Sequence, residues 1–308
     1  MTTPQGGILP LASRQAQFVL LRRRLGRRGD DNLRRLLAGI PARIDALATE
    51  NPGSLIVGCV GIGADAWHEL VGSAQPKLLR PFPRIPGAIH PAPITDADLI
   101  LHLRGERYDL LFELSEKLVV ELAEWFDPVE TVPCFRYRDL RDLTGFVDGS
   151  ENPEGDERAA VALVGAEDAD WAGGSYLHVQ RYVHRMKEWN KLPVKQQEAV
   201  VGRTKEGDEE LPDEDKPRTA HISRVVIEEK GQELEVLRHS LPYGTPGGEM
   251  GLMFASYCAT PLNFEKMLAR MIAPTHDGRV DHLLTYTRAV SGAAFFVPSR
   301  EVLQGLAG

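Results

Sequence analysis

The sequence has few cysteines and no cysteine spacing typical of a metal site. Its 308 residues include three, Cys59, Cys134 and Cys258, which are far apart and lie in apolar runs. An odd number of widely separated cysteines does not form a disulfide framework, and none of the three belongs to a metal-ligand motif. We therefore expect reduced, buried thiols of the kind found in cytoplasmic proteins.

The sequence also lacks a long apolar segment. The first 15 residues contain no apolar region of the kind that a secretory signal needs. Arginines at 22–24 and 27–28 are followed by Gly29, Asp30 and Asp31, whereas a twin-arginine signal continues with an apolar segment. No apolar run approaches the length of a transmembrane helix. These absences predict a soluble, cytoplasmic protein.

An excess of positive charge is missing as well. The net charge is −8, so no basic field is available to bind nucleic acid or an anionic membrane. The chain is nevertheless long, and 43% of its residues are hydrophobic, which is enough to bury the cores of about two domains.

The sequence does contain a repeated order of strand and helix patterns. In the first half, apolar periodicity predicts strands at 16–21, 54–60, 98–103 and 130–137 and helices at 31–49 and 108–125. Pro41 is expected to kink or split the first helix. The order β-α-β-β-α-β is the ferredoxin-like pattern.

The second half repeats this pattern in outline. We expect strands at 175–184, 222–228, 233–241, 251–259 and 291–297, a helix at 262–272 and helical pieces between 187 and 202. The predicted fold class is therefore α+β, with two ferredoxin-like domains at 1–140 and 141–308.

A short loop at 144–153 lies near the middle of the chain and holds one acid, Asp148, between Gly145 and Gly149. Glycines allow tight turns and close approach to a ligand, and Asn152-Pro153 ends regular structure. Asp148 is thus presented on an irregular loop. A turn in which the carboxylate bonds its own backbone is the simpler interpretation of this motif alone.

One histidine and one arginine stand out downstream of this loop. His221 lies at the start of the predicted strand 222–228, a suitable position for an axial ligand, although the pattern does not prefer it to His178 or His184. Arg238 shares a strand face with Leu234, Val236 and Ser240, and the next strand places Leu252 and Phe254 together. A buried arginine requires an anionic partner. Together with Asp148, these residues predict a dry pocket for a small polar reactant at a cofactor.

An acidic segment at 206–215 carries seven carboxylates. Such a run is typical of a solvated loop, and a Mn²⁺ site is the alternative.

The central motif and its order relative to the other residues give a family resemblance. Residues 145–149 resemble the G-x-x-D-G motif of the dye-decolorising peroxidases, and the extension through 150–153 is most similar to their bacterial B-type branch. The resemblance continues through 174–176, 202–205, the acidic segment, His221, Arg238 and 281–284, and covers nearly the whole chain in order.

This resemblance implies one haem b per chain, bound mainly by the C-terminal half. His221 matches the proximal iron ligand, and Asp281 matches the carboxylate that accepts the other ring N–H of that histidine. The remaining matches are the distal catalytic pair Asp148 and Arg238, the apolar distal wall of Leu252 and Phe254, and Arg203 as a contact of a haem propionate. Ser240 departs from the pattern, because some B-type members carry an asparagine there.

The resemblance implies a cytoplasmic haem peroxidase that reduces H₂O₂ and oxidises bulky donors such as dyes and phenolics by one-electron steps through a ferryl intermediate. A haem carrier or deferrochelatase-like protein of the same fold is one alternative, and a non-haem α+β module used in oligomerisation or regulation is another. Family members commonly form dimers to hexamers. Because residues 301–308 form no long extension, packaging in an encapsulin shell is the less favoured expectation.

Two further expectations concern the chemistry. If Asp148 keeps an ordinary pKa of about 3.9, it is ionised in acid and the working range is acidic. Bulky donors that cannot reach the haem require oxidisable side chains, and at least one of these should lie near the surface. The candidates are Trp125, Trp171, Trp189, Tyr243, Tyr257 and Tyr286.

Overall fold

The computed structural model describes residues 2–308. The N-terminal half consists of β1 (Gln15–Arg23), α1 (Asp31–Glu50), η1 (Pro52–Ser54), β2 (Val57–Ile62), α2 (Ala64–Leu70), β3 (Leu99–Gly105), α3 (Tyr108–Leu122) and β4 (Phe126–Phe135). Its strands are antiparallel and lie in the order β4-β1-β3-β2. The predicted ferredoxin-like pattern is confirmed for this half.

Helix α1 has the buried face that its apolar periodicity predicts. Leu33, Leu37 and Ile44 are buried on one face, and the Asp30 side chain accepts a hydrogen bond from the Leu33 amide at 2.9 Å, which caps the helix. The predicted split at Pro41 is wrong, because the helix continues through this residue as one element, and a kink there stays a prediction. Burial of this apolar face against the sheet holds the helix together despite the missing N–H.

The C-terminal half has the same plan. Its elements are α4 (Glu157–Ala162), η2 (Ala166–Trp171), β5 (Ser175–His184), α5 (Met186–Trp189), α6 (Val194–Val201), α7 (His221–Val225), β6 (Glu228–Glu229), β7 (Gln232–Glu233), β8 (Leu237–Arg238), β9 (Leu241–Gly244), β10 (Met250–Cys258), α8 (Pro261–Ile272), η3 (His282–Thr285), β11 (Thr287–Ala289), β12 (Ala293–Val297) and α9 (Arg300–Gly305). The main strand order, β12-β5-β10-β8, corresponds to that of the first half.

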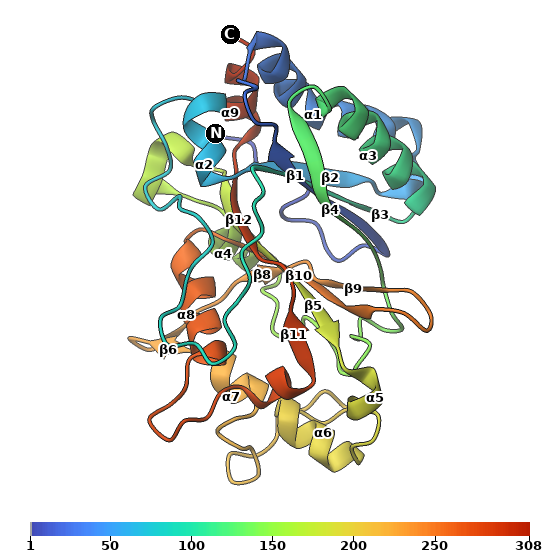
Figure 1. Ribbon diagram of the computed structural model, residues 1–308, viewed down its shortest axis with the longest axis vertical. Coiled ribbons are helices and arrows are strands. Elements are labelled where there is room, and N and C mark those ends of the chain that lie inside the picture. Colours follow the sequence, from blue (N-terminus) through green and yellow to red (C-terminus); the bar gives the residue numbers. More distant parts are fainter. Residues whose placement is uncertain (1) are drawn as a thin grey trace.

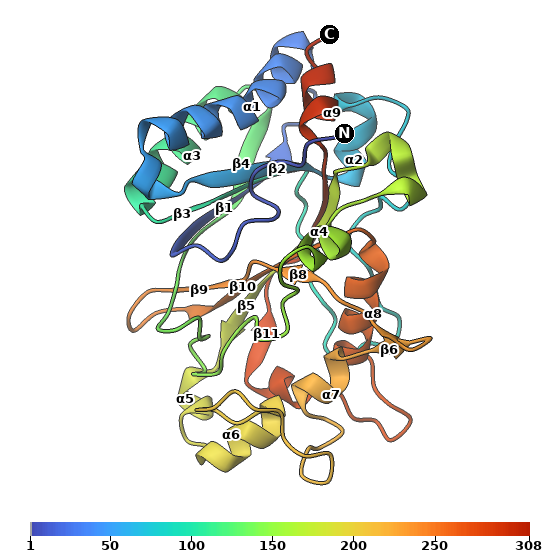
Figure 2. The ribbon, with the colours of Figure 1, turned by 180° about the vertical axis from the view of Figure 1, so that it is seen from behind.

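The two halves share one sheet. β12 pairs with β2 through Phe296 and Ile62, so within the described residues the strands form a ten-stranded sheet. Helices α1 and α3 cover the N-terminal part, and α8, α7 and α6 lie around the C-terminal part (Figures 1 and 2). A buried apolar cluster contains residues of both halves, such as Phe18 and Ile100 from the first and Leu237 and Met253 from the second. The domain boundary near Arg141 stays a prediction.

Two strand predictions in the second half are wrong. Residues 222–228 do not form a strand, because His221–Val225 is the short helix α7, and Arg224 holds it to the end of α8 by donating to the carbonyls of Arg270 and Ala273. The expected strand 233–241 is divided into β7, β8 and β9. β7 instead pairs with β6 in a small hairpin whose turn, Lys230-Gly231, has positive φ at both residues.

The cysteines and the helices bear on the predictions about thiols and membrane spans. Cys59, Cys134 and Cys258 are free and buried, as predicted. Among residues 2–308, no helix combines the length and the apolar character that a membrane crossing requires.

Candidate functional site

His221 and Asp281 come together as a pair. His221 Nδ1 lies 2.7 Å from Asp281 Oδ2, and the other carboxylate oxygen of Asp281 accepts from the Leu283 amide at 2.9 Å. Asp281 is fully buried, whereas the His221 side chain keeps 27% of its exposure. Nδ1–H donation to the carboxylate leaves Nε2 of His221 with a lone pair available for a metal.

The structure separates His221 from the two competing histidines. Both ring nitrogens of His184 are occupied, by Thr287 Oγ1 at 2.8 Å and by Asp142 Oδ1 at 3.0 Å. His178 is buried and stacked on the Phe264 ring, and burial lowers its pKa to about 3. Within the described chain, His178 has no carboxylate hydrogen-bond partner. Only His221 of these three therefore combines a carboxylate on one nitrogen with a free second nitrogen.

Asp148 is held inside the central loop by its backbone. Its amide donates to the Leu140 carbonyl at 2.8 Å, and Gly145 and Gly149 both have positive φ, near 92° and 93°. Burial raises the pKa of Asp148 to about 6, and the attraction of Arg238 offsets only part of this effect. The expectation of an ordinary pKa for Asp148 is therefore wrong, because desolvation dominates, and the acidic working range loses the premise from which it was inferred.

Asn152 joins this loop to Arg238. Its side-chain oxygen accepts from the Arg238 amide at 2.8 Å, and its side-chain nitrogen donates to the Arg238 carbonyl at 3.0 Å. These bonds act as a short bridge between the loop and β8, 86 residues apart. Asn152 belongs to the sequence motif, but its bridging role was not predicted. The only signal for that role in the sequence is an amide side chain four residues after Asp148.

Arg238 and Ser240 border a cavity of about 310 Å³ that also reaches Asp148 and Asn152. Arg238 Nε is buried and has no hydrogen-bond partner among the described residues, which marks a place for an anion or polar reactant. Ser240 Oγ accepts from the Ala255 amide at 3.3 Å. The structure thus places Asp148, Arg238 and Ser240 on one cavity.

Leu252 and Phe254 lie outside this cavity lining. They occupy one face of β10 and are opposite Tyr182 and Gln180 of β5 in the sheet register. Both are half-buried, whereas Met253 and Ala255 on the other face are buried. An apolar face left half-open inside a domain fits a flat, largely apolar group, so these residues are compatible with a haem-facing wall.

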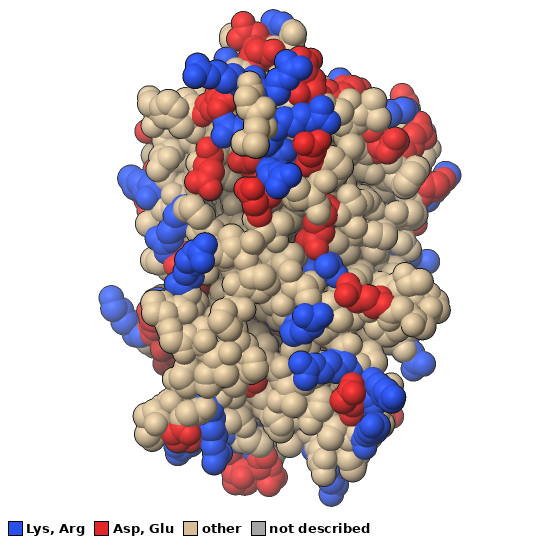
Figure 3. All heavy atoms as spheres, viewed as in Figure 1, with Lys and Arg blue, Asp and Glu red and all other residues tan. Residues whose placement is uncertain are grey.

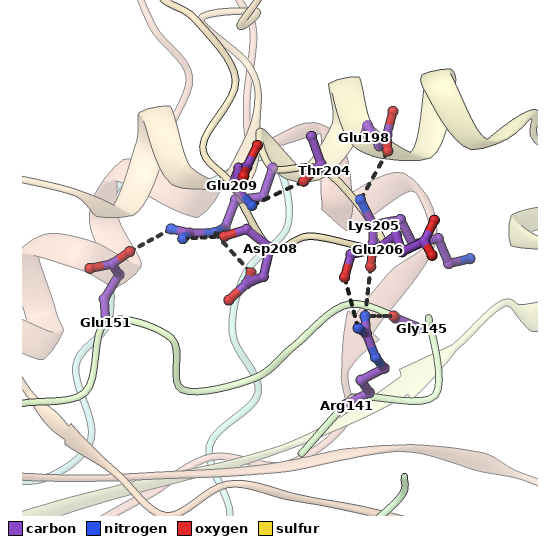
Figure 4. Close-up of polar contacts among 10 residues, drawn as sticks. Arg141, Gly145, Glu151, Glu198, Thr204, Lys205, Glu206, Asp208 and Glu209 are labelled. Carbon is purple, nitrogen blue, oxygen red and sulfur yellow. Dashed lines mark hydrogen bonds and ion pairs between the residues drawn. The ribbon is translucent and has the colours of Figure 1, made fainter. Parts of the chain in front are cut away.

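Arg203 has carboxylate partners in this structure. Its Nε lies 2.9 Å from Asp208 Oδ1, and its Nη1 lies 2.5 Å from Glu151 Oε1 in the central loop (Figure 4). In the same view, Arg141 donates to the carbonyls of Gly145 and Lys205. The start of the acidic segment is thereby fastened to the loop that carries Asp148.

The acidic segment itself is partly neutralised, because Lys216 pairs with Glu210 and Asp213. The described residues contain no group of three or more histidine, cysteine or acidic side chains arranged for a metal ion. On the face shown in Figure 3, acidic and basic side chains are intermixed.

The candidate electron-transfer aromatics are mostly internal. Trp125, Trp171, Trp189, Tyr243 and Tyr257 are all buried. Tyr286 is half-buried and is therefore the member of the set that fits the expectation of a near-surface site.

Comparisons with known proteins agree along the chain. The sequence model described as "Dyp-type peroxidase, N-terminal" matches residues 5–136, and the one described as "Dyp-type peroxidase, C-terminal" matches residues 139–302. A dye-decolorizing peroxidase of Rhodococcus erythropolis is 40% identical over 89% of this chain and 81% of its own length. One from Mycobacterium tuberculosis is 37% identical over 98% of this chain and 90% of its own.

Solved structures are similar as well. The encapsulated DyP-type peroxidase of Mycobacterium smegmatis superposes with a TM-score of 0.94 at 38% identity and covers 99% of this chain and 98% of its own. A DypB variant of Rhodococcus jostii RHA1, solved in complex with heme, gives a TM-score of 0.92 at 38% identity with 99% coverage of both chains.

Proposed function

The chain belongs to the Dyp-type peroxidase family, and from this membership we propose the roles of the residues described above. It is a haem peroxidase of the dye-decolorising type. The observation that carries the assignment of roles is the His221–Asp281 pair, in which one ring nitrogen is held by a buried carboxylate and the other is free. This is the arrangement expected of an axial histidine ligand.

His221 Nε2 would hold the iron, and Asp281 would keep the proton on Nδ1 and give the imidazole partial imidazolate character. When bound, haem would supply the iron and porphyrin that together take up the two oxidising equivalents of H₂O₂. Leu252 and Phe254 would form the apolar wall of its pocket. Arg203, held by Asp208 through Nε and Nη2, would bind a haem propionate through Nη1 in exchange for Glu151.

Asp148 and Arg238 would act on the peroxide. The ionised carboxylate of Asp148 takes the proton from one peroxide oxygen and returns it to the other, so that water can leave. The Arg238 guanidinium cannot deprotonate and stabilises the negative charge that develops on the leaving oxygen. Its buried Nε without a partner supports this role. A haem carrier would have no need for this pair, which favours the peroxidase over that alternative.

Replacement of the proposed ligand tests this assignment. His221→Ala is expected to lose most haem and its Soret band, because no other histidine in the described chain combines a carboxylate partner with a free ring nitrogen. His68→Ala, at an exposed position on α2, is the matched control and should bind haem normally. Full haem occupancy with an unchanged histidine-ligated spectrum in His221→Ala would refute the assignment. Rapid spectral change on adding H₂O₂ to the wild-type holoenzyme separates a peroxidase from a carrier.

We further propose that the donors are bulky organic molecules, such as dyes and phenolics, and that the protein works in the cytoplasm. The free, buried cysteines support a reducing compartment. We also propose a homo-oligomer of two to six chains. Phe112 and Val120 on α3 are exposed apolar side chains, at 54% and 63% exposure, on either side of the exposed Glu116, and could contribute to a contact between copies. Sedimentation of the wild type and of Phe112→Glu would show whether Phe112 takes part in such a contact.

The relative from Mycobacterium smegmatis is encapsulated. Packaging of this chain can be tested by its copurification with a coexpressed encapsulin shell.

A further inference from the structure

A buried polar cluster lies on the opposite side of the sheet from Arg238. In β10, Ser256 is opposite Arg238 and the next residue, Tyr257, is opposite Leu237. Because side chains alternate along a strand, Ser256 and Tyr257 point to opposite faces. Tyr257 is fully buried in the core between the two halves. Tyr257 is therefore separated from the site by the thickness of one strand.

The Tyr257 hydroxyl has two partners, both from the N-terminal half. Its oxygen lies 2.7 Å from His102 Nδ1 and 2.9 Å from Cys59 Sγ. Cys59 and His102 are opposite each other in the β2–β3 register, so one strand pair presents both. All three side chains are fully buried. If the thiol donates to the hydroxyl oxygen, the O–H donates to His102 Nδ1, and both hydrogen atoms are used.

This arrangement controls how Tyr257 can lose an electron. Burial raises the pKa of Tyr257 well above its ordinary value, so the phenolate does not form beforehand. An oxidised phenol that keeps its proton is a far stronger acid than an imidazolium, so its proton passes to any base that is hydrogen-bonded to it. Loss of an electron is therefore accompanied by loss of the phenolic proton. His102 Nδ1, at 2.7 Å, is a base within direct reach.

The surroundings favour rapid re-reduction of the oxidised form once a donor supplies an electron. Arg104 is buried nearby and donates to the carbonyls of Gly7 at 2.8 Å and Leu11 at 3.1 Å, with no carboxylate partner in the described chain. Burial, and after it the positive charge of Arg104, lower the pKa of His102 well below its ordinary value. A proton placed on His102 is consequently returned as soon as an electron is available. Such a pair relays an electron and does not store it.

A packed path joins this pair to the site. His239 follows Arg238 directly and points to the opposite face, where its ring lies 5.5 Å from the Tyr257 ring. Its amide donates to the Ala255 carbonyl at 2.8 Å, which connects it to the strand of Tyr257.

We propose that Tyr257 and His102 form an internal redox pair of this peroxidase. One electron moves from Tyr257 to the peroxide-oxidised enzyme, and the phenolic proton moves to His102 Nδ1. The products are a neutral tyrosyl radical, an imidazolium and an enzyme reduced by one equivalent. An electron from a donor and the proton from His102 restore the pair. The inference rests on the proposed peroxidase function, which supplies the oxidant.

The test uses the haem-loaded full-length enzyme, mixed with H₂O₂ without donor and frozen for electron paramagnetic resonance. We expect a tyrosyl signal that changes its hyperfine pattern when the tyrosines are ring-deuterated. The signal should be lost in Tyr257→Phe. The matched controls Tyr243→Phe and Tyr286→Phe should retain it. A tyrosyl signal that persists in Tyr257→Phe, or its absence from the wild type, would overturn the proposal.

A second measurement uses only the wild-type chain and so does not depend on how a variant folds. Tyr257 is the one tyrosine in residues 2–308 whose hydroxyl is hydrogen-bonded to a histidine. With ¹⁵N-labelled histidine, electron–nuclear double resonance should detect an imidazole nitrogen coupled to the radical, and an exchangeable deuteron in D₂O. Absence of both couplings would refute the pair.

The same samples distinguish this inference from the proposed function. A wild type that lacks a Soret band or does not react with H₂O₂ contradicts both. A normal reaction with H₂O₂ without a tyrosyl signal contradicts the redox pair alone.

Discussion

Replacement of Asp148 by asparagine should stabilise the haem-free protein, and the gain should grow with pH. Burial raises the pKa of this carboxyl from 3.8 to about 6. A folded-state pKa above the unfolded one means that the folded protein holds the proton more tightly. The stability that depends on this proton is present below pH 3.8 and is lost as the pH rises through about 6. Asparagine is neutral at every pH, so the variant does not lose this stability.

The size of the stability difference follows from the shift in the pKa of Asp148. About two pKa units correspond to about 3 kcal/mol of unfolding free energy, at about 1.4 kcal/mol per unit. The difference between Asp148→Asn and wild type should thus be about 1.5 kcal/mol at pH 5 and about 3 kcal/mol at pH 8. Urea unfolding followed by tryptophan fluorescence at each pH measures it. The exposed neighbour Asp139 provides the control, and Asp139→Asn should show no such trend.

Two outcomes would contradict this reasoning. A difference that stays constant between pH 5 and pH 8 would mean that Asp148 is not desolvated. An Asp148→Asn variant that becomes less stable than wild type as the pH rises would mean that attraction to Arg238 outweighs burial. If the reasoning holds, the wild-type reaction with H₂O₂ should slow below about pH 6, where Asp148 is protonated and cannot accept the peroxide proton.

The remaining predictions concern the other site residues. Arg238→Leu should slow the reaction with H₂O₂ more than Asp148→Ala does, by about 10²–10³-fold relative to wild type, because water can relay a proton but cannot replace the fixed charge; stopped-flow absorbance measures both, and the reverse order would refute the ranking. Asp281→Asn should keep haem but raise its reduction potential, since His221 loses imidazolate character; an unshifted potential in spectroelectrochemical titration counts against the pair. Asn152→Ala removes two hydrogen bonds to the Arg238 backbone and should lower the unfolding free energy by about 1–3 kcal/mol. An unfolding free energy equal to that of wild type, measured by chemical denaturation, would show that the bridge is dispensable.

Local patterns in the sequence were sufficient for much of the fold. Strands such as β1 and β5 and helices such as α1 and α8 repeat apolar residues with the period of their own geometry, and that period is visible in a single chain. Short elements were predicted less well from local patterns. α7 was mistaken for a strand because Ile222, Val225 and Val226 favour a strand locally, whereas contacts with α8 decide the outcome.

The candidate site residues could be identified from the amino-acid sequence, because the motif around Asp148 and the order of His221, Arg238 and Asp281 are local or linear features. How these residues combine depends on the packed fold. His221 and Asp281 are 60 residues apart, and Asn152 and Arg238 are 86 apart, so neither pairing has a local signal. The raised pKa of Asp148 likewise arises from burial by the whole fold, and burial is a property of the packed chain that no short stretch of residues encodes.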